Sequence, residues 1–215
     1  MNKSLADLQL DYVDLYLMHW PVTLEPTTAE QYGKEDRTVH STDWDFTKTW
    51  LSMEKLISTG KVKAIGVCNC STVNLKKLLR IANIIPAVNQ TELHPLLPQD
   101  QLNAFCKENG IHQTAFGPLG GSGSTMHTEP TLVEIAERRG ESPAQVMLSW
   151  GVQRGWSVLP KSVNAGRIKA NLQIFELTQS EMERIDGLAK IKGRRFNVPN
   201  WGVEIFHDDR SLGLE

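Results

Sequence analysis

Residues 11–21 read DYVDLYLMHWP, and this stretch decides the fold prediction for the 215-residue chain. The run is mostly apolar, which is typical of a strand buried on both faces of a parallel sheet. Pro21 cannot donate a backbone hydrogen bond to a neighbouring strand, so the strand is predicted to end near it. His19 and Trp20 then lie at the carboxyl end of the strand, where parallel α/β folds carry functional side chains. A half-buried histidine with a purely structural role is the alternative interpretation of His19.

Strands and helices are predicted to alternate along the rest of the chain. Strands begin near residues 13, 62, 86, 112 and 156, and apolar residues recur at helical spacing between them. Capping boxes mark the helix starts at Ser142 and Thr178. This alternation predicts a parallel sheet with right-handed crossovers. Residues 21–48 form a long polar segment, in which Trp44 and Phe46 either line the mouth of a site or anchor the segment to the core.

The composition is that of one globular domain and excludes several classes of partner. The chain has 23 basic and 25 acidic residues, so it offers no basic surface for nucleic acid or for an anionic membrane. No apolar run is long enough to span a bilayer, and the N-terminus lacks a secretory signal, so a cytoplasmic location is predicted. Cys68, Cys70 and Cys106 are a sparse, odd set that suits a reducing compartment and predicts no metal site.

Polar or glycine-rich residues follow each predicted strand. They are His19, Asn69, Gln90, the turn at residues 116–120 and the pair Lys161-Ser162. The carboxyl ends of parallel strands in a barrel meet at one face, so these residues are predicted to gather in a single pocket. Polar strand ends that simply meet water are the alternative interpretation.

Five ordered motifs resemble those of the aldo-keto reductase family. After DYVDLYLMHWP come GVCN at 66–69, VNQTELHP at 88–95, FGPLG at 116–120 and LPKS at 159–162. The tail WGVEIF at 201–206 is similar to that of fungal members, which are NADPH-dependent aldehyde, xylose and glycerol reductases. The resemblance implies a single domain over residues 1–215 with a tail from about residue 190. It implies an α/β fold of the (β/α)8 TIM-barrel type, incomplete, with about five of eight strand–helix units and the first three strands missing.

The resemblance also implies an activity, the reduction of aldehydes or ketones to alcohols by hydride transfer from NADPH. His19 is then catalytic and orients the carbonyl oxygen of the substrate, and Trp20 forms an apolar wall for that substrate. Asn69 and Gln90 are expected to hold the nicotinamide carboxamide, because side-chain amides both donate and accept. Phe116 is expected to stack on the nicotinamide ring.

The remaining cofactor positions follow the last two strands. Gly117, Leu119 and Gly120 belong to a loop that closes over the pyrophosphate by resemblance, although a flexible linker is equally consistent with its composition. Lys161, Ser162 and Arg167 match positions that hold the 2′-phosphate, which favours NADP over NAD. Asn171 matches an adenine contact. There is no Gly-x-Gly-x-x-Gly fingerprint, so a Rossmann domain is not predicted.

Three departures from the family pattern bear on activity. Cys68, also expected to contact the cofactor, stands beside Asn69 where serine is usual, and Ala170 replaces a common glutamate near the adenine. The family's proton-donating tyrosine, with its lysine and aspartate, has no counterpart here. The tyrosines of the chain are Tyr12, Tyr16 and Tyr32, and none matches it.

Several interpretations therefore stay open. The sequence predicts a reductase that lacks its N-terminal third, with impaired activity and an unspecified small carbonyl substrate. The alternatives are a non-catalytic NADP-binding remnant or a protein-interaction subunit. A relative of the β-subunits of potassium channels is disfavoured by the fungal-type tail. Open sheet edges predict marginal stability or self-association.

Overall fold

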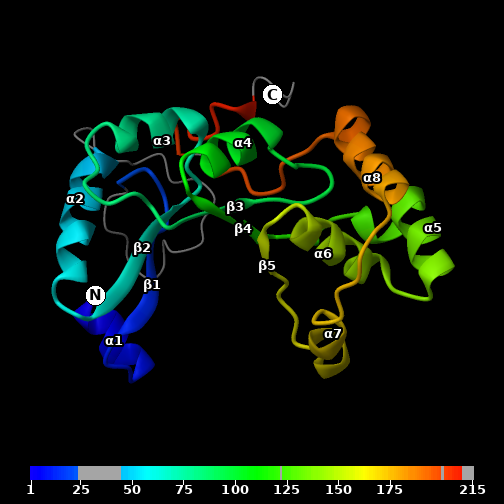
Figure 1. The fold of residues 1–215 in the computed structure, drawn as a ribbon, viewed down its shortest axis with the longest axis horizontal. Helices are drawn as coiled ribbons and strands as arrows, with labels where there is room; N and C mark the ends of the chain where they lie inside the picture. Colours follow the sequence, from blue (N-terminus) through cyan, green and yellow to red (C-terminus); the bar gives the residue numbers. More distant parts are fainter. Residues whose placement is uncertain (24–44, 122, 200, 210–215) are drawn as a thin grey trace. The chain divides into compact units, whose positions relative to one another are not determined.

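Parallel strands and helices alternate along the chain in the computed structural model, which describes residues 1–23, 45–121, 123–199 and 201–209 (Figure 1). The strands are β1 (Val13–Met18), β2 (Val62–Cys68), β3 (Val88–Glu92), β4 (His112–Phe116) and β5 (Ser157–Leu159). The helices are α1 (Asn2–Leu8), α2 (Phe46–Ile57), α3 (Thr72–Leu79), α4 (Asp100–Glu108), α5 (Pro130–Arg139), α6 (Pro143–Gln153), α7 (Ala165–Ala170) and α8 (Gln179–Lys192), with a 3-10 turn η1 (Met126–Thr128).

The order of the strands identifies the kind of sheet. The described strands form one sheet in the order β1-β2-β3-β4-β5, and β1·β2, β2·β3 and β4·β5 pair in parallel. Neighbours in the sheet are consecutive in the chain, as in a (β/α)8 barrel, whereas the order reverses within a doubly wound sheet. The predicted α/β fold, a barrel type with five strand–helix units, is confirmed.

The chain forms two compact units. The first contains Met1–Gln90, Phe105–His112 and Pro199–Asp208. The second contains Thr91–Ala104, Gln113–Val198 and, among the described C-terminal residues, Asp209. Both units therefore combine segments that are far apart in the sequence, and the tail contributes to each.

In the first unit, α2 packs against β2 and α3. The Trp50 side chain is fully buried, and its Nε1 donates to Oε1 of Glu54 at 3.0 Å. The same carboxylate accepts hydrogen bonds from the backbone N of Asn83 at 2.7 Å and of Ile84 at 2.9 Å. Glu54 thus ties α2 to the segment that leads into β3.

Strand β1 departs from the prediction that both of its faces are buried. Asp14 and Leu15 are exposed, and Leu15 keeps 38% of its surface accessible. The reason is its position, because β1 is the first strand of the sheet and pairs with β2 alone among the described strands. The apolar pattern predicted the strand correctly but carried no information on how many strands would lie beside it.

The polar segment before α2 is described only at its end. Phe46 begins α2 with 2% of its surface exposed, and Nζ of Lys77 lies 5.2 Å from its ring centroid. Phe46 therefore anchors the segment to the core, which is one of the two predicted roles. Trp44 lies outside the described residues.

In the second unit, α5, α6 and α8 enclose a core that includes Trp150 and Ile185. Helices α5 and α8 lie side by side in Figure 1 and are in contact. Both predicted capping boxes are present, Ser142 with Gln145 at α6 and Thr178 with Glu181 at α8. The turn η1 and the short helix α7 were not predicted. Among the described residues, no helix is long and apolar enough to cross a bilayer.

Candidate functional site

The predicted site residues fall into two groups, one in each compact unit. The first unit holds His19, Trp20, Cys68, Asn69 and Gln90 at or just after the ends of β1, β2 and β3. The second unit holds Phe116, Gly117, Leu119, Gly120, Lys161, Ser162, Arg167 and Asn171, which follow β4 and β5.

Asn69 connects the three strand ends of the first unit. Its φ of 58° is in the left-handed region, which asparagine tolerates better than most residues. Its backbone N donates to the carbonyl oxygen of Gln90 at 3.0 Å, and its Nδ2 donates to the carbonyl oxygen of His19 at 3.0 Å. Its Oδ1 is buried and has no partner among the described residues, so it offers an acceptor to a bound group.

Aromatic side chains surround Trp20. The Trp201 ring packs edge-on against it with centroids 4.7 Å apart, Phe206 lies at 6.2 Å, and the His19 ring lies at 5.6 Å. The His19 side chain is exposed beside them. Trp201 and Phe206 belong to the tail motif, for which the sequence predicted no role in the site. Their aromatic character was the only available signal.

Polar contacts with α3 hold this part of the tail. Oδ2 of Asp208 accepts a hydrogen bond from the backbone N of Thr72 at 2.7 Å, at the N-terminus of α3. A carboxylate there satisfies a free N–H and interacts favourably with the helix dipole. Nδ1 of His207 lies 3.1 Å from Oγ of Ser71, the N-cap of the same helix. Helix α3 therefore positions the aromatic residues that reach Trp20.

Cys68 ends β2 and is 5% exposed. Burial raises the pKa of its thiol to about 12, so the thiol is neutral at physiological pH. A neutral thiol is a weak donor, and its contact with a cofactor stays a prediction.

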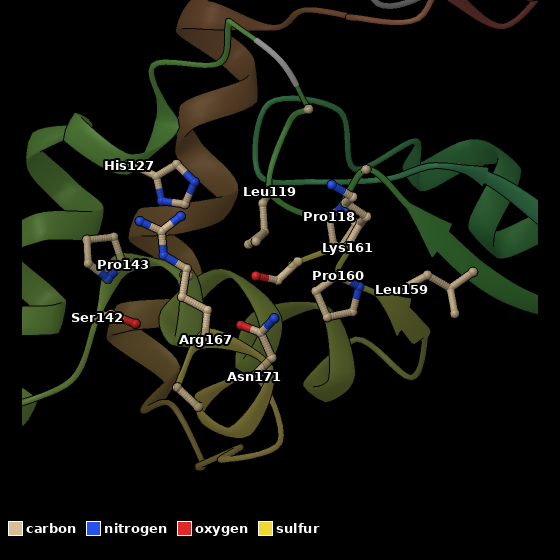
Figure 2. Close-up of a pocket in the computed structure, with 15 residues that line it drawn as sticks. Pro118, Leu119, His127, Ser142, Pro143, Leu159, Pro160, Lys161, Arg167 and Asn171 are labelled. Carbon is tan, nitrogen blue, oxygen red and sulfur yellow. The ribbon is translucent and has the colours of Figure 1, made fainter. Parts of the chain in front are cut away.

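The second group surrounds a cavity of about 710 Å³ (Figure 2). Six of the predicted residues line it, namely Gly117, Leu119, Lys161, Ser162, Arg167 and Asn171. Phe116 and Gly120 are not among the lining residues. His127 and Ser142 line the cavity as well and were not predicted.

Local turns and a cap position these side chains. Oδ1 of Asn164 accepts a hydrogen bond from the backbone N of Arg167 at 3.0 Å and starts α7. Arg167 and Asn171 are four residues apart, so they share one face of the helix. Gly120 has a φ of 83°, and a Cβ there would lie 2.3 Å from Oγ of Ser124. The turn after β4 therefore requires glycine at this position.

The cavity carries positive charge without a countercharge. No aspartate or glutamate is among its lining residues. The side chains of Lys161 and Arg167 form no ion pair or hydrogen bond with any other described residue. Two cationic groups that share a cavity with a serine hydroxyl form a favourable site for a phosphate. Among the residues that the structure describes, no cluster of metal-ligating side chains was found.

Comparisons with known proteins agree with this geometry. The model of the Aldo/keto reductase family matches residues 1–190. A glycerol 2-dehydrogenase (NADP(+)) of Saccharomyces cerevisiae is 47% identical, over 96% of this chain and 70% of its own length. A D-galacturonate reductase of Hypocrea jecorina is 43% identical, over 98% of this chain and 71% of its own. A solved aldose reductase from Giardia lamblia superposes with a TM-score of 0.85 at 37% identity, covering 95% of this chain and 71% of that one.

Proposed function

The chain belongs to the aldo/keto reductase family, and on that premise we propose that it reduces aldehydes or ketones to alcohols with NADP(H) as its cofactor. The names of its relatives support a small carbonyl substrate, such as a sugar-derived aldehyde or a ketone related to glycerol. We further propose that residues 1–215 act as one domain of this family, in the cytoplasm. The three buried free cysteines agree with that compartment.

The observation that carries the proposal is the charge of the cavity in the second unit. Lys161 and Arg167 have no acidic partner among the described residues, and no carboxylate lines the cavity. A site for NAD would present a carboxylate to the free ribose 2′-hydroxyl, whereas a dianionic 2′-phosphate requires cations. The side chains present therefore fit NADP, with Ser162 as an additional donor and Asn171 beside the adenine.

The residues of the first unit are proposed to act on the carbonyl and on the nicotinamide. The cofactor, when bound, supplies the hydride. The His19 imidazole is exposed and free to donate a hydrogen bond to the carbonyl oxygen, which polarises the carbonyl group. Trp20, Trp201 and Phe206 provide an apolar wall. The unpartnered Oδ1 of Asn69 can accept from the nicotinamide amide, with Gln90 beside it.

Stacking and proton transfer are the remaining steps. Phe116 is proposed to stack on the nicotinamide, and Cys68, Gly117, Leu119 and Gly120 to contact the cofactor. Tyr12 and Tyr16 lie on or beside β1, and Tyr32 lies outside the described residues. The resemblance assigns proton donation to none of them. We propose that a polypeptide of these 215 residues alone binds NADP(H) but turns over about 10²–10⁴-fold more slowly than one with the tyrosine, since that is the usual contribution of a general acid.

Cofactor titration tests the proposal. NADP⁺ and NAD⁺ are titrated into the full 215-residue chain and binding is followed by tryptophan fluorescence. Lys161→Ala and Arg167→Ala are each expected to weaken NADP⁺ binding about tenfold to a hundredfold and to leave NAD⁺ unchanged, because each removes a charge-assisted hydrogen bond to phosphate. Lys169→Ala is the matched control, because Lys169 lies on α7 with Arg167 but is not among the residues that line the cavity. Equal affinities for NADP⁺ and NAD⁺ in the folded protein would contradict the proposal.

A further inference from the structure

His127 and Arg167 line the same part of the cavity of the second unit. Figure 2 shows its imidazole beside the Arg167 guanidinium, with Ser142 below them. His127 belongs to the 3-10 turn η1, which follows the loop after β4, whereas Arg167 belongs to α7. Two basic side chains from different elements therefore line one part of the cavity.

Neither group has a countercharge within the described part of the chain. The His127 side chain is exposed and forms no hydrogen bond or ion pair there. The nearest carboxylates in the sequence are engaged elsewhere: Glu129 pairs with Lys192 at 2.8 Å, and Glu141 accepts from Nε2 of Gln145. Basic side chains that share one part of a cavity and have no acidic partner there form a favourable site for an anion.

We propose that His127 is a specificity-determining residue that binds the 2′-phosphate of the nucleotide together with Arg167. This inference rests on the proposed function, since it assumes that NADP(H) occupies the cavity. The imidazole can donate a hydrogen bond from a ring N–H to a phosphate oxygen. Because NAD lacks the 2′-phosphate, this hydrogen bond favours NADP over NAD.

The charged groups around His127 belong to the cavity lining and to the helices that pack against η1. Lys161 and Arg167 are the charged residues that line the cavity with it. Of the helices packed against η1, α6 carries no charged residue. The charged residues of α5 are Glu134 (paired with Arg138 and Arg184), Arg139 (paired with Glu181), and Glu137 on the exposed surface.

The test compares His127→Ala with the wild-type chain at pH 7. The probes are 2′-AMP, which carries only the 2′-phosphate, and ADP, which carries only the pyrophosphate. We expect the variant to bind 2′-AMP about threefold to tenfold more weakly than wild type, because one hydrogen bond to a phosphate is lost, and to bind ADP equally well. A loss of ADP affinity without a loss of 2′-AMP affinity would contradict the proposal.

Two further variants separate the possible outcomes. His127→Arg keeps a side chain that donates to phosphate and is expected to bind 2′-AMP at least as tightly as wild type. His112→Ala, at an exposed histidine at the start of β4, controls for the substitution itself. If His127→Ala binds both probes as tightly as wild type while Arg167→Ala binds 2′-AMP weakly, the role of His127 is wrong and the proposed function stands. If wild type binds neither probe, the proposed function itself is wrong.

Discussion

Replacement of Glu92 by glutamine is expected to destabilise the second unit strongly. Glu92 ends β3 with 2% of its surface exposed. Oε1 accepts from the backbone N of Phe196 at 2.6 Å and from Nε2 of His94 at 3.0 Å, and Oε2 accepts from the backbone N of Asn197 at 2.8 Å. Burial alone would raise the pKa of Glu92, but these donors lower it below its usual value, so the group is an anion.

The size of the destabilisation follows from the hydrogen bonds that a glutamine at position 92 can no longer accept. A glutamine oxygen at the Oε1 position keeps the bonds from Phe196 and His94, but its NH₂ then faces the backbone N–H of Asn197. One charge-assisted hydrogen bond is lost, and a buried donor is left without a partner. Together these changes cost about 2–4 kcal/mol of the free energy of unfolding. The slope of unfolding free energy against urea is about 2.5 kcal/mol/M for a domain of this size, so the midpoint is expected to fall by about 1 M.

The assay is urea unfolding followed by tryptophan fluorescence at pH 7. Glu137→Gln, an exposed carboxylate on α5, is the matched control and should shift the free energy by less than about 0.5 kcal/mol. A carboxylate with a lowered pKa contributes stability above its unfolded pKa of about 4.3, and this is lost as the pH falls through the folded value. The difference in unfolding free energy between Glu92→Gln and wild type should therefore become smaller below about pH 4. A variant within 0.5 kcal/mol of wild type at pH 7 would refute the reasoning.

Two glycines and one edge residue give further predictions. Gly66→Ala should lower the free energy of unfolding by about 1–3 kcal/mol, because the added Cβ would lie 2.7 Å from the backbone oxygen of Val88. An unchanged midpoint of urea unfolding would contradict this prediction. Gly187→Ala should raise the free energy of unfolding by about 0.5–1 kcal/mol, because the residue lies within α8 and no atom lies within 4 Å of the added Cβ. A lower midpoint of urea unfolding would contradict this prediction. Sedimentation at micromolar concentration should show self-association that Leu15→Lys reduces, since a charged residue blocks a strand edge; a monomeric wild type would count against it.

Features coded by neighbouring residues were predictable from the sequence. A capping box joins residues three apart, so the starts of α6 and α8 were predicted at Ser142 and Thr178 and are confirmed. The alternation of strands and helices was predictable for the same reason. The exposure of β1 could not be predicted in this way. The exposed fraction of Leu15 depends on whether β1 has another strand beside it in addition to β2.

The candidate site also contains residues that the sequence predicted and contacts that it did not predict. Lys161 and Arg167 are six residues apart, and the resemblance assigned both to the 2′-phosphate; the structure has them in one cavity. Trp201 lies 181 positions after Trp20, yet the two rings pack together. No periodicity or spacing encodes such a contact. It depends on the polar contacts between the tail and α3, which the sequence offers only as scattered histidine and aspartate residues.

Glu92 shows why such contacts escape a reading of the sequence. A glutamate at a strand end, with a histidine two residues later, is usually predicted to be a solvent-exposed polar residue. Burial lowers the pKa of His94, which favours the neutral ring and leaves Nε2 to donate to the carboxylate. The other two donors are backbone N–H groups more than 100 residues away. A buried anion is costly unless it is paired or hydrogen-bonded. Among the described residues, the backbone N–H groups of Phe196 and Asn197 supply two of the three hydrogen bonds to the Glu92 carboxylate, so the charge at Glu92 and the position of this segment stabilise each other.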